Sequence, residues 1–201
     1  MRLFRPGFIA ACLYPEAIFR IKTTEKLLCL TFDDGPNPDS TPQLLEVLDE
    51  FNIKAVFFCD GRAAEKYPHL IHQITSKGHV IGNHGYNHLN GWKTSTEKYT
   101  ADIGKAAATT SCSLFRPPYG RLRFWQYRKL KKNYKIVFWD LMPYDFEASF
   151  VYEKSLQILK RKIRPGSVIV LHDNPNSAAI KILVEFLAFA VDEGYNFGIK
   201  L

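Results

Sequence analysis

The sequence predicts an α/β fold built from repeated strand–helix units, either an α/β barrel or a doubly wound parallel sheet. Short apolar, β-rich runs alternate with helical patterns from about residue 27 onward, without repeats or linkers. The 201 residues are enough for one large domain. Apolar residues make up 46% of the chain and charged residues 23%, as in globular proteins, which excludes disordered, collagen-like and coiled-coil classes.

Residues 1–26 are expected to form an N-terminal extension that contains a short helix. Apolar residues recur in it at helical spacing, namely Phe4, Phe8, Ile9, Cys12 and Leu13. This spacing predicts an amphipathic helix that docks on the body of the protein or, as the weaker alternative, contacts a membrane surface as a peripheral segment.

The N-terminal sequence also bears on localisation. Pro15 interrupts the apolar run before a secretory signal sequence develops. The segment Ile9-Ala10-Ala11-Cys12 resembles a lipobox, but it lies too near Met1 to follow a normal signal peptide. Lipid modification is therefore not expected. No run approaches the roughly 18 apolar residues of a transmembrane segment. The expected location is the cytoplasm or a membrane surface, with the cell envelope as the alternative.

The cysteines indicate neither a zinc knuckle nor a disulfide framework, because they form no C-x-x-C pair and no tight cluster. We expect reduced, buried thiols at Cys12, Cys29, Cys59 and Cys112.

The first strand–helix–strand unit covers residues 27–59. Residues 27–32 and 54–59 are apolar runs typical of strands buried on both faces. Between them, Thr41 as N-cap and Pro42 at the first helical position predict a helix with the apolar residues Leu44, Leu45, Val47, Leu48 and Phe51.

The rest of the chain continues this alternation. We expect helices over about 61–77, 94–111, 122–133, 152–164 and 178–193. We expect strands over 79–82, 114–116, 136–141, 168–171 and 197–200. In an α/β sheet, the loops after these strands are the places for catalytic residues.

Two neighbouring carboxylates, Asp33 and Asp34, end the first strand within Thr31-Phe32-Asp33-Asp34-Gly35. Their side chains point in different directions, and two carboxylates this close need a cation or paired donors to remain ionised. A metal ion supplies that charge. The alternative is an Asx turn that caps the loop, which accounts for many Asp-Gly pairs.

Two histidines, His84 and His88, follow the strand over 79–82. Residues four apart share one face of a helical turn, so both imidazoles can reach one ion. Together with Asp34 they form a ligand set that leaves positions open for water, as catalytic metal sites do. Asp33 is then available as general base. His69 and His72, three apart in a predicted helix, are interpreted as ordinary surface residues.

Two further strand ends carry polar residues. Arg116-Pro117-Pro118-Tyr119-Gly120 follows the strand over 114–116, and Gly120 is expected to turn a backbone N–H toward the site. His172 ends the strand over 168–171 and can serve as general acid if a carboxylate raises its pKa. Asp145 is a better candidate for that carboxylate than Asp173, which is expected to begin the next loop.

The ordered motifs T-F-D-D-G, H-x-x-x-H, R-P-P-Y-G, a W…D-aromatic segment and L-H resemble the NodB-type polysaccharide deacetylases, carbohydrate esterase family 4. The resemblance covers residues 27–201 and implies one catalytic domain, a distorted (β/α) barrel of about seven parallel strands. It implies a divalent metal, usually zinc, with cobalt, nickel or manganese as alternatives. It further implies removal of N-acetyl groups from a glycan such as chitin or peptidoglycan.

The resemblance also implies a role for each matching residue. Asp33 matches the general base and His172 the general acid, while Asp34, His84 and His88 match the metal ligands. Arg116 matches the residue that orients the base, and Tyr119 supplies a backbone N–H to the oxyanion. Asp145 tunes the acid. The residues expected along the substrate are Leu171, Phe146, Pro117, Pro118 and Gly120, of which Leu171 walls the acetyl methyl group.

Three positions depart from the family pattern. Gly85 stands where Ser or Thr is usual, Met142 replaces the first Asp of D-x-x-D-W, and Phe146 replaces its Trp. All positions for metal binding and proton transfer are retained, so we expect an active hydrolase. The alternatives are an O-acetyl esterase, a small-molecule deacetylase and, less favoured, a non-catalytic glycan- or nucleic-acid-binding module.

The net charge of +7 is concentrated between residues 121 and 135, which contain seven cations and no acid. A solvated helix face is the commonest explanation, with Leu122, Trp125 and Leu130 available to face the body. Beside a hydrolase site, the patch is interpreted as a contact for an anionic glycan or an envelope surface. A nucleic-acid partner is not expected.

Overall fold

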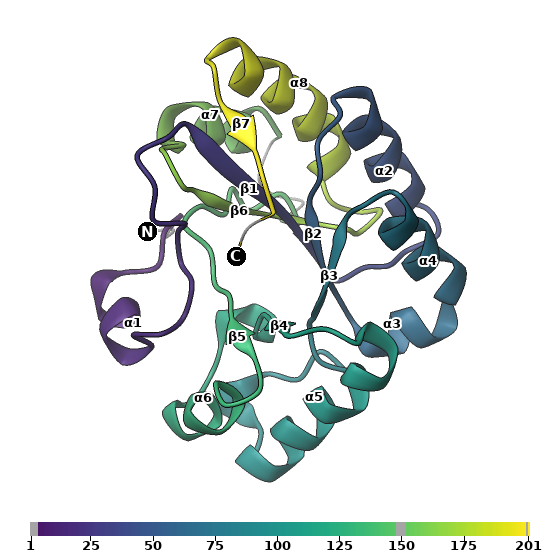
Figure 1. Cartoon of the computed structure of the whole chain (residues 1–201), viewed down its shortest axis with the longest axis vertical. Coiled ribbons are helices and arrows are strands. Elements are labelled where there is room, and N and C mark those ends of the chain that lie inside the picture. The colour runs from purple at the N-terminus through teal and green to yellow at the C-terminus, as the bar shows by residue number, and fades with distance from the viewer. Residues whose placement is uncertain (1–3, 148–151, 200) are drawn as a thin grey trace.

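A computed structural model describes residues 4–147, 152–199 and 201. At its centre lies a curled sheet in which every described strand pair is parallel, with helices outside it (Figure 1). The strands are β1 (Leu27–Asp33), β2 (Val56–Cys59), β3 (Val80–Asn83), β4 (Leu114–Phe115), β5 (Lys135–Ile136), β6 (Val168–His172) and β7 (Asn196–Phe197). Their order is β5-β4-β3-β2-β1-β6, with β7 paired to the start of β1. The predicted fold class, a distorted (β/α) barrel, is confirmed.

The sheet closes through the residues after β5. Val137 bridges to Ile18, and Leu141 bridges to Ile169 of β6, so this segment runs from one sheet edge toward the other. The predicted strand over 136–141 therefore forms only in pieces. A continuous ladder on β4 is not formed, because the segment must leave β4 to reach β6.

The helices are α1 (Phe8–Leu13), α2 (Thr41–Glu50), α3 (Gly61–Lys66), α4 (Pro68–Ser76), α5 (Thr96–Thr110), α6 (Phe124–Leu130), α7 (Tyr152–Lys162) and α8 (Ala179–Asp192). The prediction of a single helix over residues 61–77 is wrong. The segment forms two helices, because Pro68 disfavours the helical conformation at Tyr67 and begins a new helix itself. Thr41 is the first helical residue of α2, and Ser40 rather than Thr41 occupies its N-cap.

The N-terminal helix forms, but its expected docking face is exposed. Ile9 is 74% and Leu13 48% exposed. With only six residues, α1 buries little, and the residues on both sides of it make the attachment. Before the helix, Phe4 packs against the main core and its carbonyl accepts from the Met142 N–H at 3.0 Å. Tyr14 and Phe19 both stack on the ring of Phe138, at 5.3 and 4.8 Å between centroids.

Two other features of the described chain bear on the sequence-based expectations. None of its helices has the length and apolar character needed to cross a membrane. Its four cysteines are free thiols, as expected, although Cys12 is exposed rather than buried.

The largest core cluster lies between the sheet and the helices α2, α7 and α8. The middle strands contribute fully buried side chains, including Leu30, Phe32 and Phe57, which explains their uninterrupted apolar sequences. Because the parallel strands all run the same way, this core holds their carboxyl ends together at one edge of the sheet.

Candidate active site

The polar residues singled out in the sequence come together at the carboxyl end of the sheet. Asp33 ends β1 and is paired in register with His172, which ends the neighbouring strand β6. The loop after β3 carries His84 and His88, and Arg116 follows β4. Four strand ends thus supply one site, as expected for a parallel α/β sheet.

Asp34, His84 and His88 form a compact group that could hold a metal ion, with one candidate ligand atom from each lying within 4.8 Å of the others. Nε2 of His88 is 3.1 Å from Oδ1 of Asp34, and Nε2 of His84 is 3.6 Å from the same oxygen. Two imidazole nitrogens and a carboxylate oxygen suit zinc and similar divalent ions.

The two histidines lie in an irregular loop, not on the helical turn that their spacing suggested. Gly85 has φ +80° and His88 φ +52°, so the chain makes left-handed bends between the two rings. Asp102 of α5 secures this loop. Its carboxylate accepts bonds from the Tyr86 N–H at 2.8 Å and from the Asn87 side-chain amide at 2.6 Å.

Electrostatics favours the ligand form of His84 and Asp34, whereas at His88 the contact with Asp34 outweighs burial and raises the pKa in the absence of a metal ion. Nδ1 of His84 lies 2.9 Å from the Arg116 carbonyl, which can only accept, so Nδ1 carries the proton and Nε2 keeps its lone pair. Burial lowers the pKa of His84 to about 4. Burial opposes ionisation of Asp34, but its contact with His88 and the charges of the nearby histidines hold its pKa well below the usual value. The donor set therefore fits a divalent cation.

Arg116 fixes Asp33 beside this group. Its side chain is fully buried, and Nη1 donates at 2.7 Å both to Oδ1 of Asp33 and to Oγ1 of Thr31. The other end of the guanidinium donates to the Phe138 carbonyl at 2.9 Å. Oδ2 of Asp33 is left 3.9 Å from Nε2 of His84, on the side of the candidate metal site.

His172 and Asp145 form a second hydrogen-bonded pair, as the sequence suggested. Nδ1 of His172 is 2.9 Å from one Asp145 oxygen, and the His172 backbone N–H donates to the other at 2.8 Å. Burial alone would lower the pKa of His172, but the Asp145 charge and hydrogen bond outweigh it and raise the pKa to about 9. The ring of Phe146, which is 42% exposed, contacts His172 edge to face at 4.5 Å.

The loop after β4 meets the expectations only in part. Tyr119 has φ +59° and 59% exposure, and its ring lies edge to face on His88 at 4.5 Å. The N–H of Gly120 itself donates at 2.9 Å to the Pro117 carbonyl and closes the turn, which leaves the N–H of Tyr119 as the one expected to face the site. Pro118 is buried under this turn.

Leu171, expected to form an apolar wall, has no exposed surface in β6. The two histidines interpreted as ordinary, His69 and His72, are exposed on α4 and lie outside the candidate site.

Three acidic residues near the site have positions that the sequence did not predict. Asp60 and Asp102 were not among the candidate residues, and Asp173 was expected only to begin a loop. Asp60 follows β2, and its Oδ1 is buried without a hydrogen-bond partner; burial raises its pKa to about 8. The position of Asp60 directly after a strand could have marked it as a candidate site residue. No feature of the sequence marks Asp102 in this way, because it lies inside a helix.

Asp173 is buried rather than simply starting a loop. It accepts hydrogen bonds from the hydroxyls of Ser40 and Thr41, both at 2.6 Å. A Cβ on Gly35 would lie 2.1 Å from its Oδ2, so the carboxylate packs directly on the backbone after Asp33 and Asp34.

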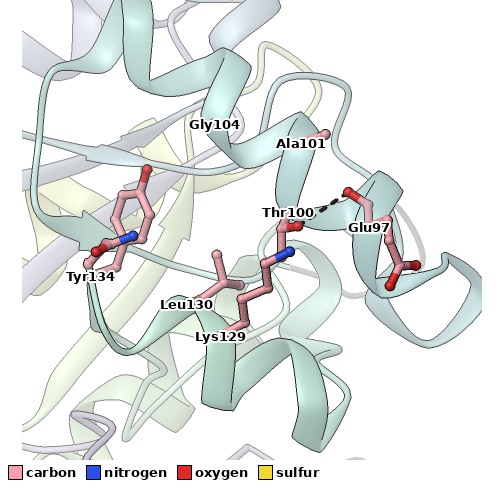
Figure 2. Close-up of a pocket in the computed structure, with 8 residues that line it drawn as sticks. Glu97, Thr100, Ala101, Gly104, Lys129, Leu130 and Tyr134 are labelled. Atoms are coloured by element: carbon pink, nitrogen blue, oxygen red, sulfur yellow. Dashed lines mark hydrogen bonds between the residues drawn. The ribbon is translucent and has the colours of Figure 1, made fainter.

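A separate groove of about 380 Å³ lies between α5 and α6 (Figure 2). Thr100 and Gly104 line it from α5, and Lys129 and Leu130 line it from α6. None of its lining residues belongs to the candidate site.

Comparison with known proteins identifies the family of the chain. Residues 20–139 match the family model described as polysaccharide deacetylase. A peptidoglycan-N-acetylglucosamine deacetylase of Bacillus cereus is 36% identical over 155 residues, which cover 74% of this chain but only 56% of the relative. A chitooligosaccharide deacetylase of Azorhizobium caulinodans is 36% identical over 174 residues, covering 80% of this chain and 81% of the relative.

The fold comparison gives the same result. The crystal structure of a peptidoglycan N-acetylglucosamine deacetylase superposes with a TM-score of 0.88 and 29% identity, covering 96% of this chain and 94% of the other. The family model, the relatives and the curled parallel sheet all identify the chain as a member of the polysaccharide deacetylase family, and hence as a hydrolase.

Proposed function

We propose that the protein is a metal-dependent deacetylase that hydrolyses N-acetyl groups of a glycan containing N-acetylglucosamine. The observation that carries the proposal is the placement of an oriented carboxylate, Asp33, and an imidazole paired with a carboxylate, His172, at the ends of adjacent strands beside a candidate metal site. Amide hydrolysis needs a base for the attacking water and an acid for the leaving amine.

Asp34, His84 and His88 would hold the ion, for which the resemblance favours zinc. A divalent cation bound there would lower the pKa of a water molecule toward about 7 and polarise the acetyl carbonyl. The neutral His84 and the ionised Asp34 support this assignment, since neither has to change its protonation state at neutral pH to act as a ligand.

Asp33 is placed to take the proton from the attacking water. The Arg116 hydrogen bond holds one of its oxygens, which leaves Oδ2 free toward the candidate metal site. The backbone N–H of Tyr119 would donate to the oxyanion of the tetrahedral intermediate, a contribution of about 3–4 kcal/mol in other acyl-transfer enzymes.

His172 is placed to protonate the leaving nitrogen. Its pKa of about 9 keeps the imidazole charged at neutral pH, and Asp145 fixes the ring so that Nε2 carries the transferable proton. Phe146 contacts the same ring and offers an exposed apolar surface beside it. A binding module would need neither the base nor this acid, which argues against a non-catalytic role.

The relatives named above act, by their names, on peptidoglycan and on chitooligosaccharides, so both are proposed substrates. The test combines metal analysis with acetate release from chitooligosaccharides, peptidoglycan and acetylated xylan. We expect one bound divalent ion, acetate release from at least one N-acetylated glycan, and a loss of about a hundredfold or more in Asp33→Asn.

A second variant tests the ligands. His84→Ala should abolish stoichiometric metal binding, and retained zinc would contradict the ligand assignment. Acetate release from the xylan alone would show that the protein is an O-acetyl esterase and not an N-deacetylase. No metal bound, or equal rates for wild type and Asp33→Asn on all substrates, would refute the catalytic proposal.

A further inference from the structure

Large aromatic side chains are exposed on the segment between β3 and α5, which also carries His88, and at the start of α6, which follows the loop that carries Arg116. Trp92 is 57%, Phe124 46% and Trp125 66% exposed. Trp125 was expected to face the body, so this exposure corrects the sequence-based interpretation. Tyr119, on the same loop as Arg116 and two residues before Arg121, has its ring centre 4.5 Å from that of His88.

Hydrogen bonds join the segment around Trp92 to residues 122–126. The Trp92 indole N–H donates to the Leu122 carbonyl at 3.3 Å, and the Arg123 guanidinium donates to the Trp92 carbonyl at 2.6 Å. The Gln126 side chain donates to the Gly91 carbonyl at 3.0 Å. A Cβ on Gly91 would lie 2.2 Å from the Arg121 carbonyl oxygen, so the loops are in direct contact. The surface is therefore built before any ligand arrives.

Arginines lie over two of the rings. The Arg121 guanidinium is 5.2 Å from the centre of the Trp92 ring, and that of Arg128 is 5.5 Å from the centre of the Trp125 ring. Both belong to the stretch 121–135, which has seven cations and no acid. Flat apolar rings and planar cations thus alternate along one surface, which we call the aromatic–arginine platform: Trp92, Arg121, Phe124, Trp125 and Arg128.

We propose that this platform binds the continuation of an anionic glycan strand whose acetylated sugar occupies the active site, an inference that rests on the proposed function. The C–H face of a β-linked sugar ring is apolar and stacks on aromatic side chains, whose π faces carry negative charge. A guanidinium pairs with a carboxylate through two parallel hydrogen bonds. A strand with alternating sugar rings and carboxylate substituents matches the platform in both respects.

Continuity with the site favours a glycan over a membrane as the occupant. Tyr119 contacts a candidate metal ligand and is two residues from Arg121, so one strand can follow the loop after β4 from the site to the platform. Binding to a membrane surface would not require aromatic residues between the active site and the platform. Membrane binding is nevertheless one of the outcomes that the experiments below can detect.

Kinetics on two substrates test the platform. In the zinc-loaded protein, we expect Trp125→Ala and Arg128→Gln each to lower kcat/KM about tenfold on purified peptidoglycan. Their kcat/KM on triacetylchitotriose, a substrate too short to reach beyond the site, should stay within about twofold of wild type. The matched controls are Val184→Ala and Lys181→Gln on α8, which lies at the opposite end of the molecule from α6 (Figure 1). Equal losses on both substrates, or none on peptidoglycan, would overturn the proposal.

Co-sedimentation separates the platform from catalysis. We expect wild type and Asp33→Asn to sediment with insoluble peptidoglycan. Binding should fall about tenfold when the carboxylates of the peptidoglycan are converted to amides, or when Trp125 of the protein is replaced by alanine. Unchanged binding after amidation would contradict the anionic contact. A parallel experiment uses vesicles of phosphatidylglycerol and phosphatidylcholine. If the protein bound these vesicles through the platform but did not bind peptidoglycan, the platform would be a membrane-binding surface. If wild type released no acetate from any substrate, the proposed function would fail while sedimentation still decided the platform.

Discussion

Asp145 controls both the direction and the charge of the His172 ring. It accepts from the backbone N–H of His172 through one oxygen and contacts the ring through the other, so the imidazole cannot turn without losing its contact with the carboxylate. Without the carboxylate, burial would be the main remaining influence and would lower the pKa of His172. The orientation and the protonation state of the acid therefore depend on one side chain.

Replacing Asp145 by asparagine tests this dependence. His172 acts in its charged form, so activity should be present below its pKa of about 9 and decline as pH rises through that value. In Asp145→Asn this alkaline decline should move down by about one pH unit or more. Profiles of kcat/KM against pH, with zinc saturating, would show the shift. An alkaline limb at the same pH in both proteins would mean that His172 is not the titrating acid.

Asp60 is the opposite case, a carboxyl group with a buried, unpaired oxygen. Its pKa of about 8 lies above the value near 3.9 of an unfolded chain, so folding without metal takes up a proton between these pH values and stability falls as pH rises through that range. Asp60→Asn removes this cost. We expect a gain in Tm of about 4 °C at pH 7.5 in a chelating buffer and a smaller gain at pH 5. The exposed Asp39→Asn is the control, and equal gains for Asp60→Asn at both pH values would contradict the explanation.

The loop between β3 and α5 depends on a helix for its shape. Asp102 of α5 binds the backbone N–H groups of Tyr86 and Asn87, between the two histidine ligands. In Asp102→Asn, one of the two acceptor oxygens becomes an NH2 donor, so at least one of the N–H groups that face Asp102 loses its acceptor and the loop is held less firmly. Groups that orient metal ligands typically contribute 10–100-fold to affinity, so we expect zinc to bind about tenfold more weakly or worse.

Competition with a chromogenic chelator measures that affinity. Glu97→Gln, in the first turn of the same helix, is the matched control. Activity lost at limiting zinc should return in large part at saturating zinc, since Asp102 acts through the ligands. An unchanged zinc affinity would show that the loop keeps its shape without the carboxylate.

Gly85 shows why this loop departs from the family pattern. At φ +80° a side chain is strained, and a Cβ would also lie 3.1 Å from Oδ2 of Asp102. We expect Gly85→Ala to lower Tm by about 2–4 °C. Gly104→Ala, in α5 with no atom within 4 Å of the added Cβ, should raise it slightly because alanine favours the helix. Melting curves of both variants would test the pair, and a Gly85→Ala protein as stable as wild type would exclude strain at this position.

At the scale of the molecule, Arg116 joins the two sides of the curled sheet. It follows β4, bonds Thr31 and Asp33 of β1, and bonds the carbonyl of Phe138 in the segment that closes the barrel. One buried cation thus connects Asp33, the proposed base, to the closure of the sheet.

Arg116→Met should lower the free energy of unfolding by about 3–5 kcal/mol, because it leaves the Asp33 carboxylate buried without its partner. Adding Asp33→Asn should recover part of this loss. Urea denaturation of the two single variants and the double variant gives the coupling energy. Strictly additive losses would mean that Arg116 acts on the sheet independently of Asp33.

The strand ends could be predicted from the sequence because their signal is local. An apolar run followed by a polar motif, as in Asp33-Asp34 or His172, places side chains at the carboxyl edge of a parallel sheet whatever the details of the loops. The pairing of Asp145 with His172 was also foreseen. The roles of Asp102 and Asp173 were not, because their partners lie 15 or more residues away and no neighbouring residue marks them.

Other errors arose where tertiary contacts decide the outcome. The spacing of Ile9 and Leu13 is correct for a helix, but the body offers no surface that covers them. Trp125 was assigned to the core by its hydrophobicity, whereas its neighbours Tyr127 and Leu130 fill that space.

The contact between Gly35 and Asp173 has an evolutionary consequence. The carboxylate occupies the space that any side chain at position 35 would need, while it binds the hydroxyls at the start of α2. Neither residue can change freely while the other stays, so the motif after β1 and the motif after β6 are constrained as one unit. Among descendants of this sequence, we expect larger residues at position 35 only together with smaller ones at position 173, along with loss of the Ser40 and Thr41 hydroxyls.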